Sequence, residues 1–286
     1  RAPVLLCPAM NDAMWAHPQT QRNAEHVRDV LGYRLIGPAI GPLAFGEGTG
    51  PGRMDEPNVI IEHVGRALED ASVLTGKRVV VTAGPTREAV DPVRVLSNRS
   101  SGRMGYAIAA AAWRRGADVL LISGPSSVAP PVGPRLQHVE TADDMANAVR
   151  AAVGDAEVLI MAAAVADFRP AAPATGKIKK QAGVSAIELE PAPDVLNVTR
   201  TQRAKHLKVI GFALETDSHE ANAKKKLQEK GMDLVVLNDA TETGAGFEVA
   251  TNKVTIFSAD GSSESLPLMS KDDVAEAIID RLIRIL

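Results

Sequence analysis

The sequence is short of several features that define whole classes of protein. It has a single cysteine, Cys7, in 286 residues, which excludes a disulfide framework and a metal site built from thiolates. Aromatic residues make up 3% of the chain, and the net charge is −3. A nucleic-acid-binding surface normally needs a basic patch or stacking aromatics, so no nucleic-acid partner is expected. No apolar run reaches membrane-spanning length and no signal peptide is recognisable, so we expect a soluble cytoplasmic protein without a membrane partner.

The two best-known nucleotide-binding motifs are also missing. Neither G-x-G-x-x-G nor G-x-x-x-x-G-K-[ST] occurs in the stretch VTAGPTREAVDPVRVLSNRSSGRMG, residues 81–105. The stretch nevertheless leaves an apolar run through a glycine and enters a regular segment through small polar residues. This is the outline of a nucleotide-binding strand, loop and helix.

From about Lys77 onward, short apolar runs alternate with helical patterns, which is typical of a parallel sheet covered by helices on both faces. Strands are expected at residues 78–84, 118–124, 208–215 and 233–239, with one arm of a hairpin at 252–261. Residues 156–167 are expected to form a further strand that runs into a turn. Helices are expected at residues 102–117, 141–154, 219–231 and 270–286. The sequence therefore predicts an α/β fold, with a Rossmann-like three-layer domain whose sheet is mostly parallel.

Parallel sheets bind ligands at the carboxyl ends of their strands, which selects the loops 84–103, 123–135, 164–180 and 213–219. In the first loop, a helix is preceded by the small polar residues Ser97, Asn98, Ser100, Ser101 and Gly102. Unpaired N–H groups and a partial positive charge suit a helix N-terminus to phosphate, and Arg94 and Arg99 add cations. The same residues also make an ordinary helix cap, so the pattern alone leaves both interpretations open.

Further charged side chains lie in the other loops and on one helix. Asp167 follows the alanine run of AAAVAD, where a carboxylate either holds Mg²⁺ against a triphosphate or forms a turn. The three lysines of GKIKK, residues 176–180, are either solvated or able to close over a charged reacting group. Lys226 and Lys230 share a helix face, where they are solvated or directed at phosphates. These residues indicate an anionic ligand and no particular reaction.

The first quarter of the chain has a different pattern. It is rich in turns and glycine, with a helix and a short linker expected at residues 63–76. The chain also starts inside an apolar run, which we interpret as a fragment of a longer protein. We therefore expect a domain boundary near residues 74–77.

Taken in order, several motifs resemble those of one enzyme family. The segments TAGPTREAVDPVRVLSNRSSGRMGYAIA, AAAVADFRP, GKIKK, PDVL, GFALET and DLVVLND are similar to phosphopantothenate–cysteine ligase, the C-terminal half of the bacterial bifunctional coenzyme A biosynthesis proteins. PAMNDAMW and GPGRM resemble the end of the other half, a flavin-dependent phosphopantothenoylcysteine decarboxylase. The resemblance implies that residues 1–74 are the C-terminal part of the decarboxylase domain with a linker, and that residues 75–286 are the ligase domain.

The resemblance also implies a two-step reaction. The carboxylate of 4′-phosphopantothenate attacks the α-phosphate of CTP, giving an acyl-cytidylate and pyrophosphate, and the amine of L-cysteine then displaces CMP. Mg²⁺ would accompany CTP. Such chemistry depends mainly on positioning and charge neutralisation, which fits a chain without a recognisable nucleophile.

Roles follow from the resemblance for individual positions. Asn98 and Arg94 would support the acyl-cytidylate step, and Lys177 would resolve that intermediate. Asp167 matches the aspartate at CTP and its cation, and Ser100, Ser101 and Gly102 form the phosphate cradle. Besides Asp167 and Lys177, the nucleotide-binding positions are Met161, Ala162, Ala163, Ala164, Pro193, Asp194, Val195, Leu196, Phe212, Lys226 and Lys230.

The segment before residue 75 departs from the decarboxylase pattern. The family has a catalytic cysteine in a flap near GPGRM, whereas this sequence has Phe45 there, and phenylalanine cannot act as an acid. Asn11 matches a substrate-binding asparagine, and FMN would belong to the decarboxylase half of the full-length protein. The family also implies a homodimer through the ligase domain and a dodecamer for the full-length protein.

Two other functions stay open at this level. An NAD(P)-dependent oxidoreductase suits a Rossmann-like sheet, although G-x-G-x-x-G is missing and no acidic residue ends the run 118–124. A catalytically silent assembly module is the other, although Asn98, Asp167 and Lys177 are all in place.

Overall fold

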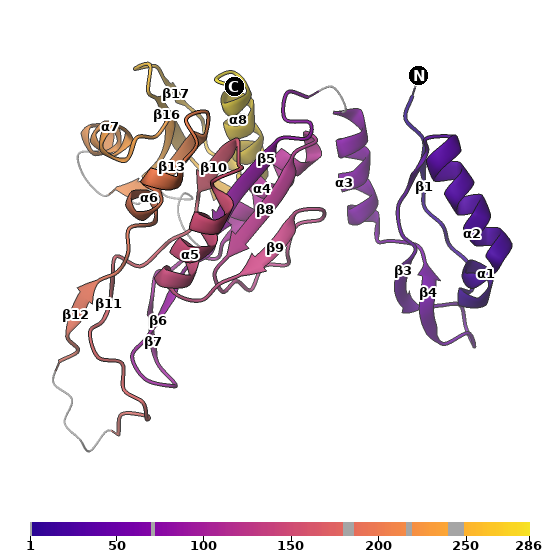
Figure 1. The fold of residues 1–286 in the computed structure, drawn as a ribbon, viewed down its shortest axis with the longest axis horizontal. Coiled ribbons are helices and arrows are strands. Elements are labelled where there is room, and N and C mark those ends of the chain that lie inside the picture. Colours follow the sequence, from indigo (N-terminus) through magenta and orange to yellow (C-terminus); the bar gives the residue numbers. More distant parts are fainter. Residues whose placement is uncertain (1, 70–71, 180–185, 216–218, 240–248) are drawn as a thin grey trace. The chain divides into compact units, whose positions relative to one another are not determined.

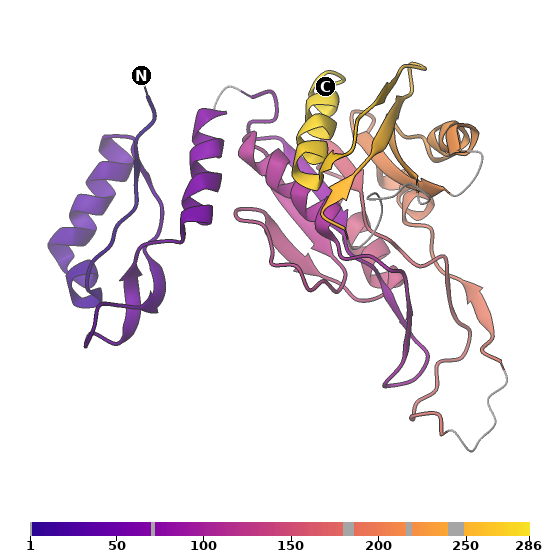
Figure 2. The same cartoon turned by 180° about the vertical axis from the view of Figure 1, so that it is seen from behind.

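The computed structural model describes residues 2–69, 72–179, 186–215, 219–239 and 249–286 (Figures 1 and 2). The chain divides into two compact units, Arg1–Ser72 and Val73–Leu286, which are considered separately. This division lies just before the boundary expected near residues 74–77.

The first unit consists of short strands and helices. In it, β1 (Leu5–Leu6) pairs in parallel with β2 (Arg34–Leu35), and β3 (Ala39–Pro42) pairs in antiparallel fashion with β4 (Thr49–Arg53). Between β1 and β2 lie α1 (Asp12–Ala16), α2 (Pro18–Glu25) and the π-helical turn η1 (His26–Val30). The helix expected within residues 63–76 is α3 (Pro57–Leu68). The expected bounds were wrong because a proline is favoured at the first helical position, so the helix starts at Pro57.

The second unit is built on an eight-stranded sheet in the order β17-β16-β14-β13-β10-β5-β8-β9. Its parallel strands are β5 (Arg78–Ala83), β8 (Asp118–Ser123), β9 (Arg135–His138), β10 (Val158–Met161), β13 (Lys208–Glu215) and β14 (Leu234–Asp239). An antiparallel edge is added by β16 (Val254–Ser258) and β17 (Ser263–Ser265). The predicted α/β fold with a mostly parallel sheet is confirmed.

Helices cover both faces of this sheet, as the side chains of β5 illustrate. Val79 and Val81 pack in one core with α4 (Arg103–Arg114) and α8 (Lys271–Ile283), whereas Val80 packs in the other core with α5 (Ala142–Ala152). The second core also receives α6 (Val195–Val198), which η3 (Arg200–Gln202) follows, and α7 (His219–Lys230). Beyond its first residue, β5 is therefore buried on one face or the other, which explains its continuous apolar run.

One strand ends early within its predicted range. Residues 156–167 were expected to form a strand that runs into a turn, and the strand part is β10, which ends at Met161. Beyond it, Oγ1 of Thr82 accepts the N–H of Ala163 at 3.2 Å and Oγ1 of Thr86 accepts the N–H of Ala166 at 3.0 Å. These two buried threonines supply side-chain partners in place of strand partners, so the alanine run leaves the sheet as a loop.

Two narrow arms extend from the carboxyl edge of the sheet and lie side by side in both views (Figures 1 and 2). One is the hairpin of β6 (Arg87–Ala89) and β7 (Val95–Ser97), and the other is the pair β11 (Phe168–Pro170) and β12 (Leu189–Pro191). A further small pair joins β15 (Thr251–Asn252) to β18 (Met269–Ser270). Among the described residues, no helix has the length and apolar character that crossing a membrane requires.

Candidate functional site

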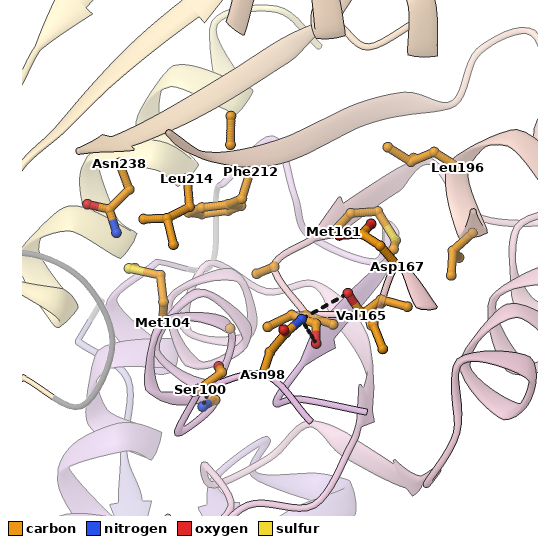
Figure 3. Close-up of a pocket in the computed structure, with 18 of the residues that line it drawn as sticks. Asn98, Ser100, Met104, Met161, Val165, Asp167, Leu196, Phe212, Leu214 and Asn238 are labelled. Atoms are coloured by element: carbon orange, nitrogen blue, oxygen red, sulfur yellow. Dashed lines mark hydrogen bonds between the residues drawn. The ribbon is translucent and has the colours of Figure 1, made fainter. Parts of the chain in front are cut away.

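A cavity of about 680 Å³ lies at the carboxyl edge of the parallel sheet (Figure 3). Residues of three of the four loops expected to bind a ligand line it, but none of the described residues 123–135 does. The hydroxyl of Ser126 in that loop instead donates to the main-chain oxygen of Ser101 at 2.8 Å. The expectation that this loop lines the ligand site was wrong. The loop instead contacts the main chain of Ser101, which does line the cavity.

The small polar residues before α4 form the part of the cavity that was expected to hold phosphate. Gly102 precedes the helix with a φ of 80°, which glycine adopts without strain, and no side-chain hydrogen bond caps the helix. The N–H of Gly102 lies 3.3 Å from Oγ of Ser100, and that of Arg103 lies 3.5 Å from Oγ of Ser101. Since the first N–H groups of a helix have no partner within the helix, this end of α4 is suited to an anion.

Gly105 sets the position of this helix end. A Cβ atom at residue 105 would lie 2.6 Å from Cβ of Ala83 and 2.8 Å from the main-chain oxygen of Thr82. Only glycine allows so close an approach of α4 to β5. The N-terminus of α4 is thereby placed beside the end of β5 and the loop that follows β10.

Asn98 joins the segment before α4 to the alanine loop. Its Nδ2 donates to the main-chain oxygens of Ala164 at 3.2 Å and Val165 at 3.1 Å (Figure 3). The N–H of Ala164 in turn donates to the oxygen of Gly84 at 2.9 Å. The alanine loop is thus fixed by its main chain, while its methyl side chains leave room for a planar ligand. Because both amide hydrogens of Asn98 face carbonyls, the side chain offers its Oδ1 as an acceptor.

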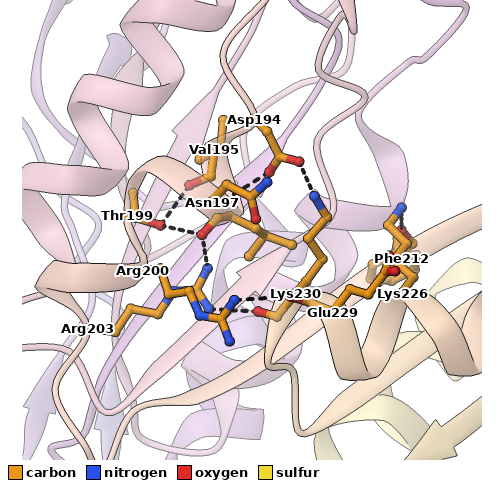
Figure 4. Close-up of polar contacts among 11 residues, drawn as sticks. Asp194, Val195, Asn197, Thr199, Arg200, Arg203, Phe212, Lys226, Glu229 and Lys230 are labelled. Atoms are coloured by element: carbon orange, nitrogen blue, oxygen red, sulfur yellow. Dashed lines mark hydrogen bonds and ion pairs between the residues drawn. The ribbon is translucent and has the colours of Figure 1, made fainter.

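Another part of the wall carries two cations from α7 (Figure 4). Nζ of Lys226 donates to the main-chain oxygen of Phe212 at 2.9 Å, and Lys230 pairs with the carboxylate of Asp194. Asp194 also caps α6 by accepting the N–H of Asn197 at 3.0 Å. Burial opposes ionisation of Asp194, but the hydrogen bonds from Lys230 and Asn197 outweigh it and hold the pKa of this carboxyl below its ordinary value.

Two arginines tie α6 to the end of α7 (Figure 4). Arg203 donates to the main-chain oxygens of Leu196 and of Lys230, the latter at 3.1 Å, and Arg200 donates to that of Glu229 at 3.2 Å. The last carbonyls of a helix lack donors within the helix, and its C-terminus favours positive charge. The arginines therefore hold the two segments that present Asp194 and the lysines in one arrangement.

The cavity brings most of the predicted site residues together. These are Asn98, Ser100, Ser101, Gly102, Met161, Ala162, Ala163, Ala164, Asp167, Pro193, Asp194, Val195, Leu196, Phe212, Lys226 and Lys230. Their shared location is an observation, whereas their individual roles stay predictions.

Three predicted residues are not among the lining residues. Arg94 and Lys177 are exposed and lie where the β6–β7 hairpin meets the loop after β11, with Nη2 of Arg94 donating to the oxygen of Ile178 at 3.3 Å. Asn11 belongs to the first unit, where its Oδ1 accepts the N–H of Ala13 at 2.8 Å and caps α1. Lys180 of GKIKK lies outside the described residues.

Several lining residues were missed at the level of sequence: Arg103, Met104, Val165, Phe168, Leu214, Asn238, Asn252 and Lys271. Asn238 is the second-last residue of β14, so the rule about carboxyl ends of strands could have found it. Lys271 begins α8 and is 7% exposed. A cation is unfavourable at a helix N-terminus, and that unusual position was the available signal. Burial, together with the charge of Arg103, lowers the pKa of Lys271.

Asp167 is the exposed carboxylate at the predicted cation position. In the part of the chain that the structure describes, no three or more His, Cys, Asp or Glu side chains gather into a group that could hold a metal ion. Mg²⁺ is often bound through one or two carboxylates, with substrate phosphates supplying other ligands. Asp167, which shares its cavity with the predicted phosphate cradle, fits that mode, whereas the described residues do not fit a metal centre built by the protein alone.

Comparison with known proteins gives matches along the chain. Residues 74–286 match the family described as DNA/pantothenate metabolism flavoprotein C-terminal domain, and residues 1–69 match the family described as Flavoprotein. The coenzyme A biosynthesis bifunctional protein CoaBC of Bacillus subtilis is 44% identical over 284 residues, which are 98% of this chain and 69% of that protein. A cysteine/cysteine sulfinic acid decarboxylase from an unknown prokaryotic organism is 40% identical over 288 residues, which are 99% of this chain and 80% of that protein.

Solved structures agree with these matches. The crystal structure of the C-terminal domain of a coenzyme A biosynthesis bifunctional protein CoaBC shares 40% sequence identity with a TM-score of 0.63, covering 74% of this chain and 96% of that one. Both the sequence and the fold of the second unit therefore have counterparts among known proteins. The chain belongs to the family of the bifunctional coenzyme A biosynthesis proteins CoaBC, with a DNA/pantothenate metabolism flavoprotein C-terminal domain preceded by a short flavoprotein segment.

Proposed function

We propose that residues 75–286 catalyse the CTP-dependent ligation of L-cysteine to 4′-phosphopantothenate, giving 4′-phosphopantothenoylcysteine, pyrophosphate and CMP in coenzyme A biosynthesis. The observation that carries this proposal is one cavity in which Asn98, Asp167, the cradle at residues 100–102 and the lysine pair of α7 meet. The relatives named for coenzyme A biosynthesis support the same pathway.

In the first step, the carboxylate of 4′-phosphopantothenate attacks the α-phosphorus of CTP, and the bond to the β-phosphate breaks, so that pyrophosphate leaves. Among the described residues, four cations line the cavity, Arg103, Lys226, Lys230 and Lys271, against the two carboxylates of Asp167 and Asp194. Together with the N-terminus of α4, this excess of positive charge offsets the repulsion between a triphosphate and an approaching carboxylate. Mg²⁺ held by Asp167 and the phosphates would add to that neutralisation.

The nucleotide base is assigned to the segment 193–196 and Phe212. Val195 and Leu196 are buried, Phe212 is half-buried, and all of them line the cavity. The alanines 162–164 leave space for a planar base beside the main chain. Recognition of cytosine would then depend on main-chain groups, which is why no side-chain signature of it can be seen in the sequence.

In the second step, the amine of L-cysteine attacks the acyl carbon of the acyl-cytidylate, and CMP leaves with the electron pair of the broken acyl–oxygen bond. Asn98 is within the cavity, whereas Arg94 and Lys177 would act from the adjoining hairpin and loop. The ammonium group of Lys177 would stabilise the charge that develops on the acyl oxygen.

The proposal is tested by following pyrophosphate release with Mg²⁺ and 4′-phosphopantothenate, comparing CTP with ATP in the presence and absence of L-cysteine. We expect release with CTP alone, and sustained turnover with CMP formation once cysteine is added. Lys177→Gln should retain the first release and lose sustained turnover, while Lys205→Gln, at an exposed lysine outside the cavity lining, should match the parent chain. Unchanged turnover in Lys177→Gln would make the assigned role untenable.

The same assay separates the two alternatives. An oxidoreductase would bind NAD(P) and leave CTP intact. A silent assembly module would release pyrophosphate with neither nucleotide, and in that case the ligase proposal fails.

For residues 1–74 we propose only that they are the C-terminal part of a flavin-dependent decarboxylase domain, with FMN belonging to the longer protein. Phe45 is exposed in the turn between β3 and β4 and cannot act as an acid, and Asn11 already caps α1. No decarboxylation step is therefore derived for this chain. A homodimer through the ligase domain, a dodecamer of the longer protein and a cytoplasmic location also remain proposals, and the native mass of the chain in solution tests the first of them.

A further inference from the structure

A buried carboxylate joins the β6–β7 hairpin to the loop that carries Lys177. Asp91 lies in the turn of the hairpin with a fully buried side chain, although residues 92–99, which follow it, are all exposed. Charged side chains are seldom buried unless they are paired and hydrogen-bonded. The surroundings of Asp91 are therefore a specific arrangement.

The two carboxylate oxygens of Asp91 have different partners. Oδ1 accepts the N–H groups of Val93 and Arg94, both at 2.8 Å, which closes the turn of the hairpin. Oδ2 accepts the N–H of Ile178 at 3.2 Å and lies 3.4 Å from Nη1 of Arg94. One oxygen thus shapes the hairpin, and the other holds a segment that lies 87 residues further along the chain.

Other contacts fix the same junction. Nη2 of Arg94 donates to the main-chain oxygen of Ile178 at 3.3 Å, and the N–H of Ala174 donates to the oxygen of Val90 at 3.0 Å. Ile178 is therefore held at both its N–H and its carbonyl. Burial opposes ionisation of Asp91, but the three N–H groups and Arg94 outweigh it and lower the pKa of this carboxyl.

The position of Lys177 depends on this junction. Residues 171–179 form neither helix nor strand and are rich in alanine, proline and glycine, so few constraints act along the loop itself. The side chain of Lys177 is exposed. Contacts to the neighbouring main chain are therefore what can fix the position of this residue. Its immediate neighbour Ile178 is the residue that Asp91 and Arg94 hold.

We propose that Asp91 is a positioning residue for the ligation: through its Oδ2 it holds residues 176–179 against the hairpin and so fixes Lys177 relative to Arg94 and Asn98. The inference rests on the function proposed above for Lys177. Asp91 itself is outside the cavity lining and acts only through the segments that it joins.

Asp91→Asn separates the two tasks of the side chain. The amide oxygen can still close the turn, but an NH₂ group replaces Oδ2 and faces the N–H of Ile178 and the guanidinium of Arg94, which are both donors. Asp260→Asn is the matched control, because Oδ1 of Asp260 accepts the N–H of Ser262 at 2.8 Å and the hydroxyl of Ser262 at 2.6 Å, both within the turn of the β16–β17 hairpin.

The first readout is independent of catalysis: cleavage by trypsin after Lys177 and Lys179 under native conditions, followed by mass spectrometry. A protease needs a locally opened chain, so cleavage reports how often the loop leaves the hairpin. We expect a roughly tenfold faster cleavage in Asp91→Asn, for the loss of about one charge-assisted hydrogen bond, and no change in Asp260→Asn. An unchanged rate at Lys177 in Asp91→Asn would overturn the inference.

The second readout is the split between kcat and KM. Since the cavity does not include Asp91, the KM for CTP should stay within about twofold while kcat for ligation falls. The contacts of Asp91 and Arg94 with Ile178 are called the clamp below. Faster cleavage with an unchanged kcat would show that the clamp does not serve ligation and would overturn the positioning role. If the parent chain has no ligase activity, the proposed function fails, and the proteolysis result still decides whether the clamp exists.

A second variant covers the case in which Asp91→Asn does not fold. Arg94→Gln, at an exposed position, removes the guanidinium from Asp91 and from the oxygen of Ile178, while the buried carboxylate keeps its three N–H donors. Cleavage after Lys177 should rise by roughly threefold in this variant, because the Asp91 contact to Ile178 stays in place. A rate equal to that of the parent chain would count against the clamp.

Discussion

Replacing Arg203 by methionine is expected to loosen the nucleotide side of the cavity. The guanidinium holds the main-chain oxygens of Leu196 and Lys230, the latter at 3.1 Å, and so joins α6 to the end of α7. Methionine keeps a long unbranched stem but has no donor. Both carbonyls would therefore lose a charged partner, while the packing of the stem is largely retained.

The size of the effect follows from burial. A hydrogen bond from a charged group contributes about 1.5–3 kcal/mol, but Arg203 is only half-buried, so solvent screening reduces this. Burial and the charge of Arg200 also lower the pKa of Arg203, which means that the folded protein already disfavours this cation. The oxygen of Leu196 keeps one further donor, since Oγ1 of Thr199 lies 3.4 Å away. We therefore expect the free energy that holds α6 to the end of α7 to fall by about 1–2 kcal/mol. Because these segments line the nucleotide side of the cavity, the same loss in CTP binding corresponds to a roughly five- to thirtyfold rise in the KM for CTP.

The assay is steady-state pyrophosphate release at varied CTP, combined with urea unfolding of each variant. Arg200→Met is the matched control, because Arg200 is exposed and makes one bond, to the oxygen of Glu229 at 3.2 Å. It should change the KM by less than about twofold. A folded Arg203→Met variant with an unchanged KM for CTP would refute the reasoning that the link between α6 and α7 sets the nucleotide site.

Two further predictions concern packing and pH. Gly105→Ala places a Cβ atom 2.6 Å from Cβ of Ala83 and should lower the free energy of unfolding by about 1–3 kcal/mol in urea denaturation, whereas Gly154→Ala, with nothing within 4 Å, should not. Because the pKa of Asp194 in the folded chain lies below its ordinary 3.8, its ion pair with Lys230 stabilises the fold above that pH and is lost as the pH falls through the folded pKa. The urea midpoint should thus fall more steeply below about pH 4 for the parent chain than for Asp194→Asn, and parallel curves would contradict this.

The central part of the fold could be predicted because burial on both faces leaves a clear pattern. The run at residues 78–84 became β5 since each of its valines packs against one helical layer or the other. Thr141 likewise caps α5, with the capping box completed by Asp144. The residue at which β10 gives way to the predicted turn could not be read from the sequence. The alanine run after Met161 is apolar enough for a strand, but the hydroxyls of Thr82 and Thr86 accept its N–H groups and the run leaves the sheet.

The candidate site was predicted unevenly for similar reasons. Asn98 and Asp167 follow strands in sequence, so both the strand-end rule and the family resemblance point to them. Lys271 comes from α8, almost at the end of the chain, and its unusual position at a helix N-terminus does not indicate which cavity it lines. Arg94 and Lys177 were expected to act with Asn98, but the structure has them on an adjoining hairpin and loop.

The sequence by itself determined the alternation of strands and helices, the placement of small polar residues before α4 and the family to which the motifs point, because these depend on neighbours along the chain. The tertiary structure alone decided which distant residues share an environment. Asp91 and Ile178 meet across 87 residues, and Arg203 joins two helices at their main-chain carbonyls. Such contacts are made with N–H and C=O groups that every residue carries, so the identity of the contacted residue leaves no trace in the sequence.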